Sequence, residues 1–151
     1  MIQFLIGIVI VFGSFIQTEQ ETKQDQVDFT NPESVVNAIF DAAREQDFTI
    51  LSLLCDPEGE GDGDVKQICS VTGLAEEVQK NPADKNLKRD LEDFVSVFKK
   101  GKITGETTYK TFKDIEYASV PFCFDHPGGD DRSNETMELV KRMDKWYLYS
   151  F

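Results

Sequence analysis

Hydrophobic residues in the first two thirds of the chain recur at the three- and four-residue spacing of amphipathic helices. Residues 30–33 (Thr-Asn-Pro-Glu) combine a capping residue, an early proline and a first-turn acid, which predicts a helix over residues 32–46. A short second helix is expected over residues 49–54. Asn81-Pro82 opens a third helix that ends at Gly101. The apolar stripe of this helix consists of Leu87, Leu91, Phe94, Val95 and Phe98.

After Gly101 the pattern changes to the alternation that is typical of strands. Four strands are predicted, at residues 103–111, 117–124, 135–142 and 145–151. The alternating residues that should share one face of the second strand are Ala118, Val120, Phe122 and Phe124. A tight turn is expected at Met143-Asp144, and residues 125–134 have the composition of a longer turn.

Helices followed by a meander of strands predict a segregated α+β domain. Strands joined by short links must run antiparallel, because parallel pairing needs a long crossover. We therefore expect N-terminal helices packed against a curved antiparallel sheet of about four strands.

The charge of the chain limits its partners. The 151 residues include 28 acidic and 16 basic side chains, which gives a net charge of −12. An acidic surface repels phosphate backbones, so nucleic acid is not expected as a partner. The only histidine, His126, lies in the Gly/Pro-rich turn, where an exposed side chain is expected, and this argues against catalysis through histidine.

The amino terminus has the composition of an export signal. The first 18 residues carry no charged side chain, and residues 2–16 are almost continuously apolar. A helix needs about 20 apolar residues to cross a bilayer core, so this shorter run fits a secretory signal better. Residues 1–17 are predicted to be a signal peptide or an uncleaved N-terminal anchor, although no Lys or Arg precedes the run. A buried first strand is the alternative.

The rest of the domain organisation follows from this interpretation. Residues 18–29 are expected to be a polar linker, and residues 30–151 a single domain. We expect the protein to be exported, whether periplasmic, secreted or membrane-tethered, rather than cytoplasmic. Membrane contact is expected only through the N-terminal segment.

Residues 55–69 (CDPEGEGDGDVKQIC) are the most unusual stretch of the chain. Acids alternate with glycine in its first half, which predicts a surface loop. Asp64 is expected to cap a short helix that extends through Ile68 and Val71. Residues 73–80 are expected to be weakly helical at best.

The acidic loop partly matches a calcium-binding template. The acids at positions 1, 3, 5 and 9 of this template are Asp56, Glu58, Glu60 and Asp64. Gly61 stands at position 6, but Gln67 replaces the bidentate Glu of position 12. Weak Ca²⁺ binding and a solvated acidic loop are the two interpretations, and no other cofactor is expected.

The three cysteines predict one disulfide. Cys55 and Cys69 bracket the acidic loop and are the natural pair in an oxidising compartment, which leaves Cys123 as a small buried residue. Three reduced thiols are the alternative for a cytosolic protein.

The order of elements and the closing segment ETMELVKRMDKWYLYSF resemble the nuclear transport factor-like superfamily, which is also described as cystatin-like. The resemblance depends on the opening helix and on a final hairpin whose last strand carries Trp146. It implies a cone: a strongly curved sheet wrapped around helices, with a hydrophobic pocket. Enzymes of the superfamily, such as ketosteroid isomerase and scytalone dehydratase, project Tyr, Asp or His into the cone. Residues 31–100 contain no Tyr and no His, so no catalytic residue is assigned.

Together these observations predict an exported, non-catalytic binding module for a small apolar ligand or a protein partner. The candidate recognition residues lie in the aromatic strands and are Phe122, Phe124, Trp146 and Tyr149. A homodimer through the sheet face is also expected. The alternative is a cone-pocket isomerase or dehydratase, which would need buried carboxylates beside an open pocket.

Overall fold

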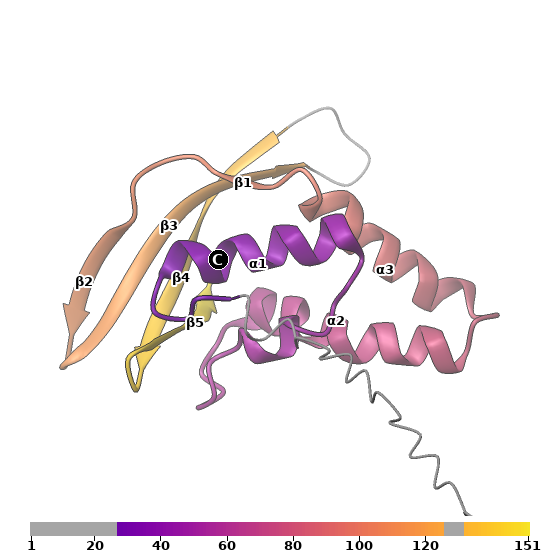
Figure 1. Cartoon of the computed structure of the whole chain (residues 1–151), viewed down its shortest axis with the longest axis horizontal. Helices are drawn as coiled ribbons and strands as arrows, with labels where there is room; N and C mark the ends of the chain where they lie inside the picture. Colours follow the sequence, from indigo (N-terminus) through magenta and orange to yellow (C-terminus); the bar gives the residue numbers. More distant parts are fainter. Residues whose placement is uncertain (1–26, 126–131) are drawn as a thin grey trace, which may run out of the picture.

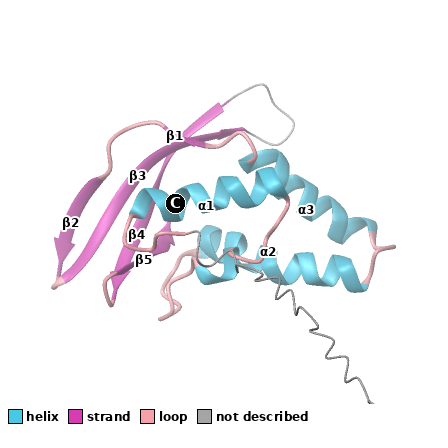
Figure 2. Cartoon of the chain, viewed as in Figure 1, coloured by secondary structure: helices cyan, strands magenta, loops and turns pink. Residues whose placement is uncertain are grey.

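The computed structural model describes residues 27–125 and 132–151, and its fold is α+β. Figure 1 shows α1 (Pro32–Glu45) inside the curve of a sheet, with α2 (Gly63–Lys80) and α3 (Lys85–Phe98) forming a hairpin that projects to one side. Figure 2 shows that helices and strands form separate layers. The fold class predicted from the sequence is therefore confirmed. The expected signal or anchor segment, most of the expected linker and His126 lie outside the described residues.

The start of α1 agrees with the prediction. Asn31 is the N-cap, and its side chain accepts a hydrogen bond of 2.9 Å from the amide of Glu33. Pro32 follows in the first turn, where its missing N–H costs no helical hydrogen bond. The helix ends at Gln46, which has a left-handed conformation with φ of 54°.

The region between α1 and α3 differs most from the prediction. Only a 3₁₀ turn, Leu51–Leu53, forms where a second helix was expected. In contrast, α2 continues through the segment that was expected to be weakly helical and is 18 residues long. It starts one residue before Asp64, because Asp62 is the N-cap. Packing of α2 against α3 and against the 3₁₀ turn supplies the stability that its local propensity lacks.

The third helix begins at Lys85 rather than at Pro82, because Asp84 caps it by accepting hydrogen bonds from the amides of Asn86 and Leu87. The predicted stripe is only partly buried. Phe94 and Phe98 are buried, whereas the half-buried members of the stripe are Leu87, Leu91 and Val95.

The sheet is open and antiparallel, with the order β1-β3-β4-β5, and β2 also pairs with β3. Its strands are β1 (Lys102–Ile103), β2 (Thr108–Phe112), β3 (Ile115–Asp125), β4 (Arg132–Arg142) and β5 (Lys145–Ser150). The first predicted strand is therefore split in two. The amide of Thr104 donates to the carbonyl of Pro121 at 2.9 Å, but proline has no N–H to return, so the ladder breaks there.

Two tight turns join the long strands. Lys113-Asp114 connects β2 to β3, and Met143-Asp144 connects β4 to β5. All four residues have positive φ angles, of 49°, 65°, 47° and 63°. Two-residue hairpin loops favour this left-handed geometry because it matches the twist of the strands. The turn predicted at Met143-Asp144 is confirmed.

The core lies between the helices and the inner face of the sheet. The four residues predicted to share one face of β3 are all buried there, as are Met137, Leu139 and Leu148 of the neighbouring strands. Gly101 passes directly over the ring of Phe40, and a Cβ atom at this position would collide with that ring. The loop after α3 therefore requires glycine for a close approach.

Irregular segments cover the outer edge of β5. The amide of Trp146 donates to the carbonyl of Phe29 and the amide of Leu148 to the carbonyl of Leu54, each at 2.8 Å. This pairing removes an open strand edge, and it fixes the chain on either side of α1 to the sheet.

Candidate functional site

Phenylalanine side chains from the helices, the sheet and the carboxyl terminus meet in one cluster. The ring centroid of Phe98 lies 5.0 Å from that of Phe94, 5.8 Å from that of Phe124 and 6.4 Å from that of Phe151. Phe151 in turn lies 5.6 Å from Phe122. These rings fill the space between α3 and β3.

The structure brings together only two of the four predicted recognition residues. Phe122 and Phe124 stack with their centroids 5.8 Å apart inside the cluster. Trp146 is buried outside this cluster, and its ring centroid lies 5.9 Å from that of Tyr109. Tyr149 contacts Tyr117 on the face of the sheet opposite the core, with centroids 5.5 Å apart. The four residues therefore do not form a single site.

A groove with a volume of about 480 Å³ lies between α2 and α3, beside the phenylalanine cluster. This volume falls within the range of roughly 300–1,000 Å³ that is usual for ligand pockets. The apolar residues that line it are Ile68, Val71, Leu74, Phe94, Val97, Phe98 and Phe151. Leu74, Val97 and Phe151 are half-buried, so the groove offers apolar surface to a second molecule.

Each wall of the groove is a helical stripe. The lining residues of α2 recur at the spacing of one helix face and extend from Asp64 to Leu74. Those of α3 extend from Asp90 to Phe98. At 1.5 Å per residue these stripes are about 15 Å and about 12 Å long. The site is therefore an elongated groove framed by two helices.

The polar part of the groove is acidic. Its lining includes Asp64 from α2 and Asp90 and Asp93 from α3, but no Lys or Arg. Asp90 lies 3.5 Å from the guanidinium of Arg89, and both side chains are more than half exposed, so this pair is weak. In the part of the chain that the structure describes, no cation lies within salt-bridge distance of Asp64 or Asp93.

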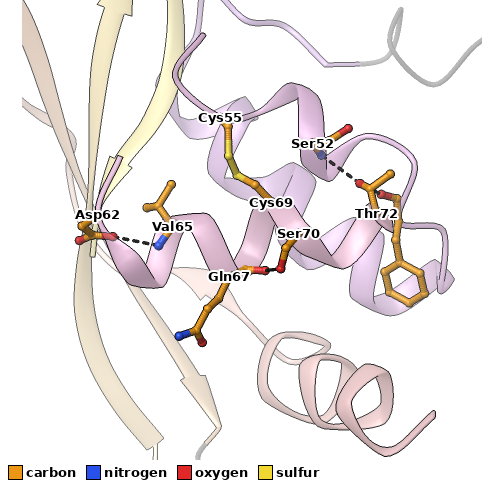
Figure 3. Close-up of a disulfide and its surroundings, with 9 residues drawn as sticks. Ser52, Cys55, Asp62, Val65, Gln67, Cys69, Ser70 and Thr72 are labelled. Carbon is orange, nitrogen blue, oxygen red and sulfur yellow. Dashed lines mark hydrogen bonds between the residues drawn. A yellow bond between two sulfur atoms is a disulfide. The ribbon is translucent and has the colours of Figure 1, made fainter. Parts of the chain in front are cut away.

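A disulfide holds α2 against the preceding segment. Cys55 and Cys69 are bonded, with their Cα atoms 6.1 Å apart, so the predicted pairing is confirmed, and Cys123 is a buried free thiol. Thr72 adds two hydrogen bonds. Its hydroxyl accepts from the amide of Ser52 at 3.0 Å and donates to the backbone carbonyl of Phe48 at 2.6 Å. Figure 3 shows both attachments joining α2 to the same neighbouring segment.

Asp62 attaches the start of α2 to the sheet. Its amide donates to the carbonyl of Tyr149 at 2.9 Å, while its carboxylate accepts from the amides of Val65 and Phe151 at 2.9 Å and 3.1 Å. Burial by itself raises the pKa of Asp62, but these amide hydrogen bonds and one from Ser150 outweigh it and hold the pKa below its usual value. Asp62 therefore fixes one end of the groove.

The acidic loop contacts a cation of the chain itself. The Nη2 atom of Arg142, at the end of β4, lies 3.0 Å from carboxylate oxygens of Asp56 and Glu60 and 3.3 Å from one of Glu58. The Asp56 side chain is fully buried, and that of Arg142 is 9% exposed. Asp64, the fourth acid of the calcium template, lies instead in the first turn of α2 and lines the groove.

This ion pair sets the charge of Asp56. Burial raises the pKa of Asp56, but the hydrogen bond from Arg142, the amide of Glu58 and the guanidinium charge together lower it below its usual value. The same hydrogen bond raises the pKa of Arg142. Both groups are therefore charged at neutral pH.

Residues 27–125 and 132–151 contain neither a group of candidate metal ligands nor a helix suited to a membrane span. Over these ranges, no three His, Cys, Asp or Glu side chains are grouped so that they could hold a metal ion. Calcium binding by the acidic loop stays a prediction. None of the helices there combines the length and the hydropathy that a membrane span needs.

No family model matches the sequence, and no curated protein is similar to it at a significant level. The structure itself therefore gives the class of the protein. It is an α+β domain with one disulfide and a groove that has an apolar floor and acidic borders.

The α2–α3 groove was not predicted from the sequence, because the helix after the acidic loop was expected to be short and to extend only through Val71. Ile68, Val71 and Leu74 continue at helical spacing, and this signal was present, but Gly73 interrupts the stretch and lowers its helix propensity. The contact between Arg142 and the acidic loop had no signal in the local sequence.

Proposed function

We propose that the protein is an exported, non-catalytic binding module that recognises apolar groups in the groove between α2 and α3. The groove itself supports this proposal: an elongated, partly exposed apolar floor that adjoins the phenylalanine cluster. Burying such surface stabilises a complex by about 25 cal/mol per Å² of apolar area before the costs of association.

Export is supported by two features. The Cys55–Cys69 disulfide fits an oxidising compartment, because cytosolic reductants keep most thiols reduced. The apolar, uncharged residues 1–17 have the composition of a signal or anchor.

The packing inside the curve of the sheet favours a binding module over a cone-pocket isomerase or dehydratase. Such an enzyme needs an acid or base beside a substrate within that curve. There Phe124 and Phe151 pack against Phe98 of α3, and Phe122 packs against Phe151. The space next to β3 is thus filled with hydrocarbon, and the open apolar surface lies between the helices instead.

A neutral apolar dye tests this proposal. We expect N-phenyl-1-naphthylamine to bind the full chain saturably, and Val97→Asp to weaken its binding at least tenfold, because a charge is placed on the groove floor. The matched control is Val95→Asp, two residues away on α3: this valine is also half-buried but lines a different surface, with Lys88 and Ser96. Any dye that binds residues 1–16 contributes the same fluorescence signal in the wild-type protein and in both variants.

Thermal melts followed by circular dichroism establish that each variant is folded. Amide shifts in NMR spectra of the wild-type protein provide an independent measurement, and the dye should move Val71, Leu74 and Val97. Equal loss of binding in the two variants, or shifts confined to other surfaces, would contradict the proposal.

A further inference from the structure

The charge of the groove indicates what kind of partner it binds. We propose that the groove receives a basic amphipathic helix of a partner protein. Apolar side chains of that helix lie on the groove floor, and its lysines or arginines contact Asp64, Asp90 and Asp93. This inference rests on the proposed function, because it names the occupant of the same groove.

The shape of the groove fits a helix. The two framing stripes are about 15 Å and about 12 Å long, which corresponds to two to three turns of an α-helix. A helix that lies along such a groove presents apolar residues at positions i, i+3, i+4 and i+7 to the floor. The half-buried Leu74 and Val97, one from each wall, are placed to contact these residues.

The charges of the groove fit a basic helix specifically. Asp64 stands on one wall, and Asp90 and Asp93 stand on the other, so acids flank the apolar floor from both sides. An amphipathic helix carries its polar residues on both borders of its apolar stripe. Lysines or arginines at these borders would therefore meet the aspartates on both walls.

The same charges exclude other occupants. An acidic helix or an anionic headgroup would be repelled by the three aspartates and by the net charge of −12. The first 18 residues of the chain itself are apolar but contain no Lys or Arg, so they lack the cationic side chains that would pair with the aspartates. The only chain cation at an ion-pairing distance from these three acids within the described residues is Arg89, at 3.5 Å from Asp90.

Three model peptides test the inference on the full chain. They share one leucine face over 18 residues and carry Lys, Gln or Glu on the polar face. We expect the Leu–Lys peptide to bind at least tenfold more tightly than the Leu–Gln peptide, and the Leu–Glu peptide not to bind, in fluorescence-anisotropy titrations. Raising the salt concentration should weaken only the Leu–Lys complex, because exposed charges are screened.

A pair of charge-matched variants locates the interaction. Asp90→Asn together with Asp93→Asn should weaken binding of the Leu–Lys peptide about tenfold. Glu76→Gln together with Glu92→Gln removes two charges from exposed positions of α2 and α3 outside the groove, and should change the affinity less than twofold.

The other possible outcomes contradict either the basic-helix inference alone or the proposed function as well. Equal affinity for the Leu–Lys and Leu–Gln peptides would overturn the charge inference but leave the apolar groove as a binding site. Equal weakening in both double variants would show a general attraction to the acidic surface, which also overturns the inference. Binding of the neutral dye without any peptide would identify a small ligand as the occupant. Failure of dye and peptides alike would overturn the proposed function itself.

Discussion

The acidic loop after Cys55 and the acidic rim of the α2–α3 groove contain the same kind of side chain in different surroundings. In the loop, Asp56 is fully buried against Arg142, and the same guanidinium contacts Glu58 and Glu60. On the rim, the aspartates border an apolar floor that has no Lys or Arg among its lining residues. A nearby cation of the chain distinguishes the loop acids, which are structural, from the rim acids, which we propose contact a partner.

This difference has opposite consequences for stability. The loop carboxylates and Arg142 hold the loop against the β4–β5 end of the sheet, so the loss of Arg142 leaves the buried carboxylate of Asp56 without its cation. The rim carboxylates repel one another at the surface, and their removal should cost the fold little.

The strongest test of the comparison is the removal of the loop cation. We expect Arg142→Ala to destabilise the fold by about 3–5 kcal/mol, since the carboxylate of Asp56 would remain buried and unpaired. Urea unfolding measures this effect. The control is Arg132→Ala at the other end of β4, which breaks a more exposed pair with Asp125 and should destabilise the fold far less. Equal effects of the two substitutions would contradict a structural role for the loop acids.

The next largest effect should come from the disulfide that brackets the loop. Replacing both Cys55 and Cys69 by alanine should destabilise the protein by about 3 kcal/mol, because the bond limits the unfolded chain over a loop of about 15 residues. Reduction should shift the melting temperature of the wild-type protein to that of the variant. Non-reducing peptide mapping should recover one linked 55–69 peptide and one alkylatable thiol at Cys123. Three free thiols would contradict both the bond and the export proposal.

Acid should weaken the attachment of the acidic loop. The pKa of Asp56 is lowered in the folded state, so its contribution is fully present above the ordinary value of 3.8 and is lost as the pH falls through the lower folded pKa. The free energy of unfolding should therefore decline below that value. We expect Asp56→Asn to flatten this decline, and Glu58→Gln, at an exposed position of the same loop, serves as the control. Equal slopes for all three proteins in urea unfolding at several pH values would show that Asp56 does not carry the effect.

Calcium should produce the smallest change. Arg142 already contacts three of the four template acids, and the bidentate ligand of position 12 is missing, so we expect weak binding or none in calorimetric titrations. Any heat that is observed should disappear when Asp56→Ala and Glu60→Ala are combined. Submicromolar affinity would show that the loop rearranges and releases Arg142.

The sequence by itself determined the features that depend on neighbouring residues. The start of α1 follows from Asn31 and Pro32, and the β4–β5 hairpin follows from a two-residue turn between alternating strands. Cys55 and Cys69 were paired because both bracket one loop and Cys123 lies in a strand. Local spacing is sufficient in each case, because the interacting groups are close along the chain.

The tertiary structure decided the features that depend on distant residues. The full length of α2 depends on its packing against α3. The break between β1 and β2 depends on Pro121 of the neighbouring strand. The acidic loop is held by Arg142, which is 86 residues beyond Asp56. The groove arises only where the stripes of two helices meet. The local sequence around a carboxylate is the same whether a guanidinium or an open apolar floor lies beside it in the folded protein. The role of the carboxylate therefore depends on which groups the fold brings into contact with it.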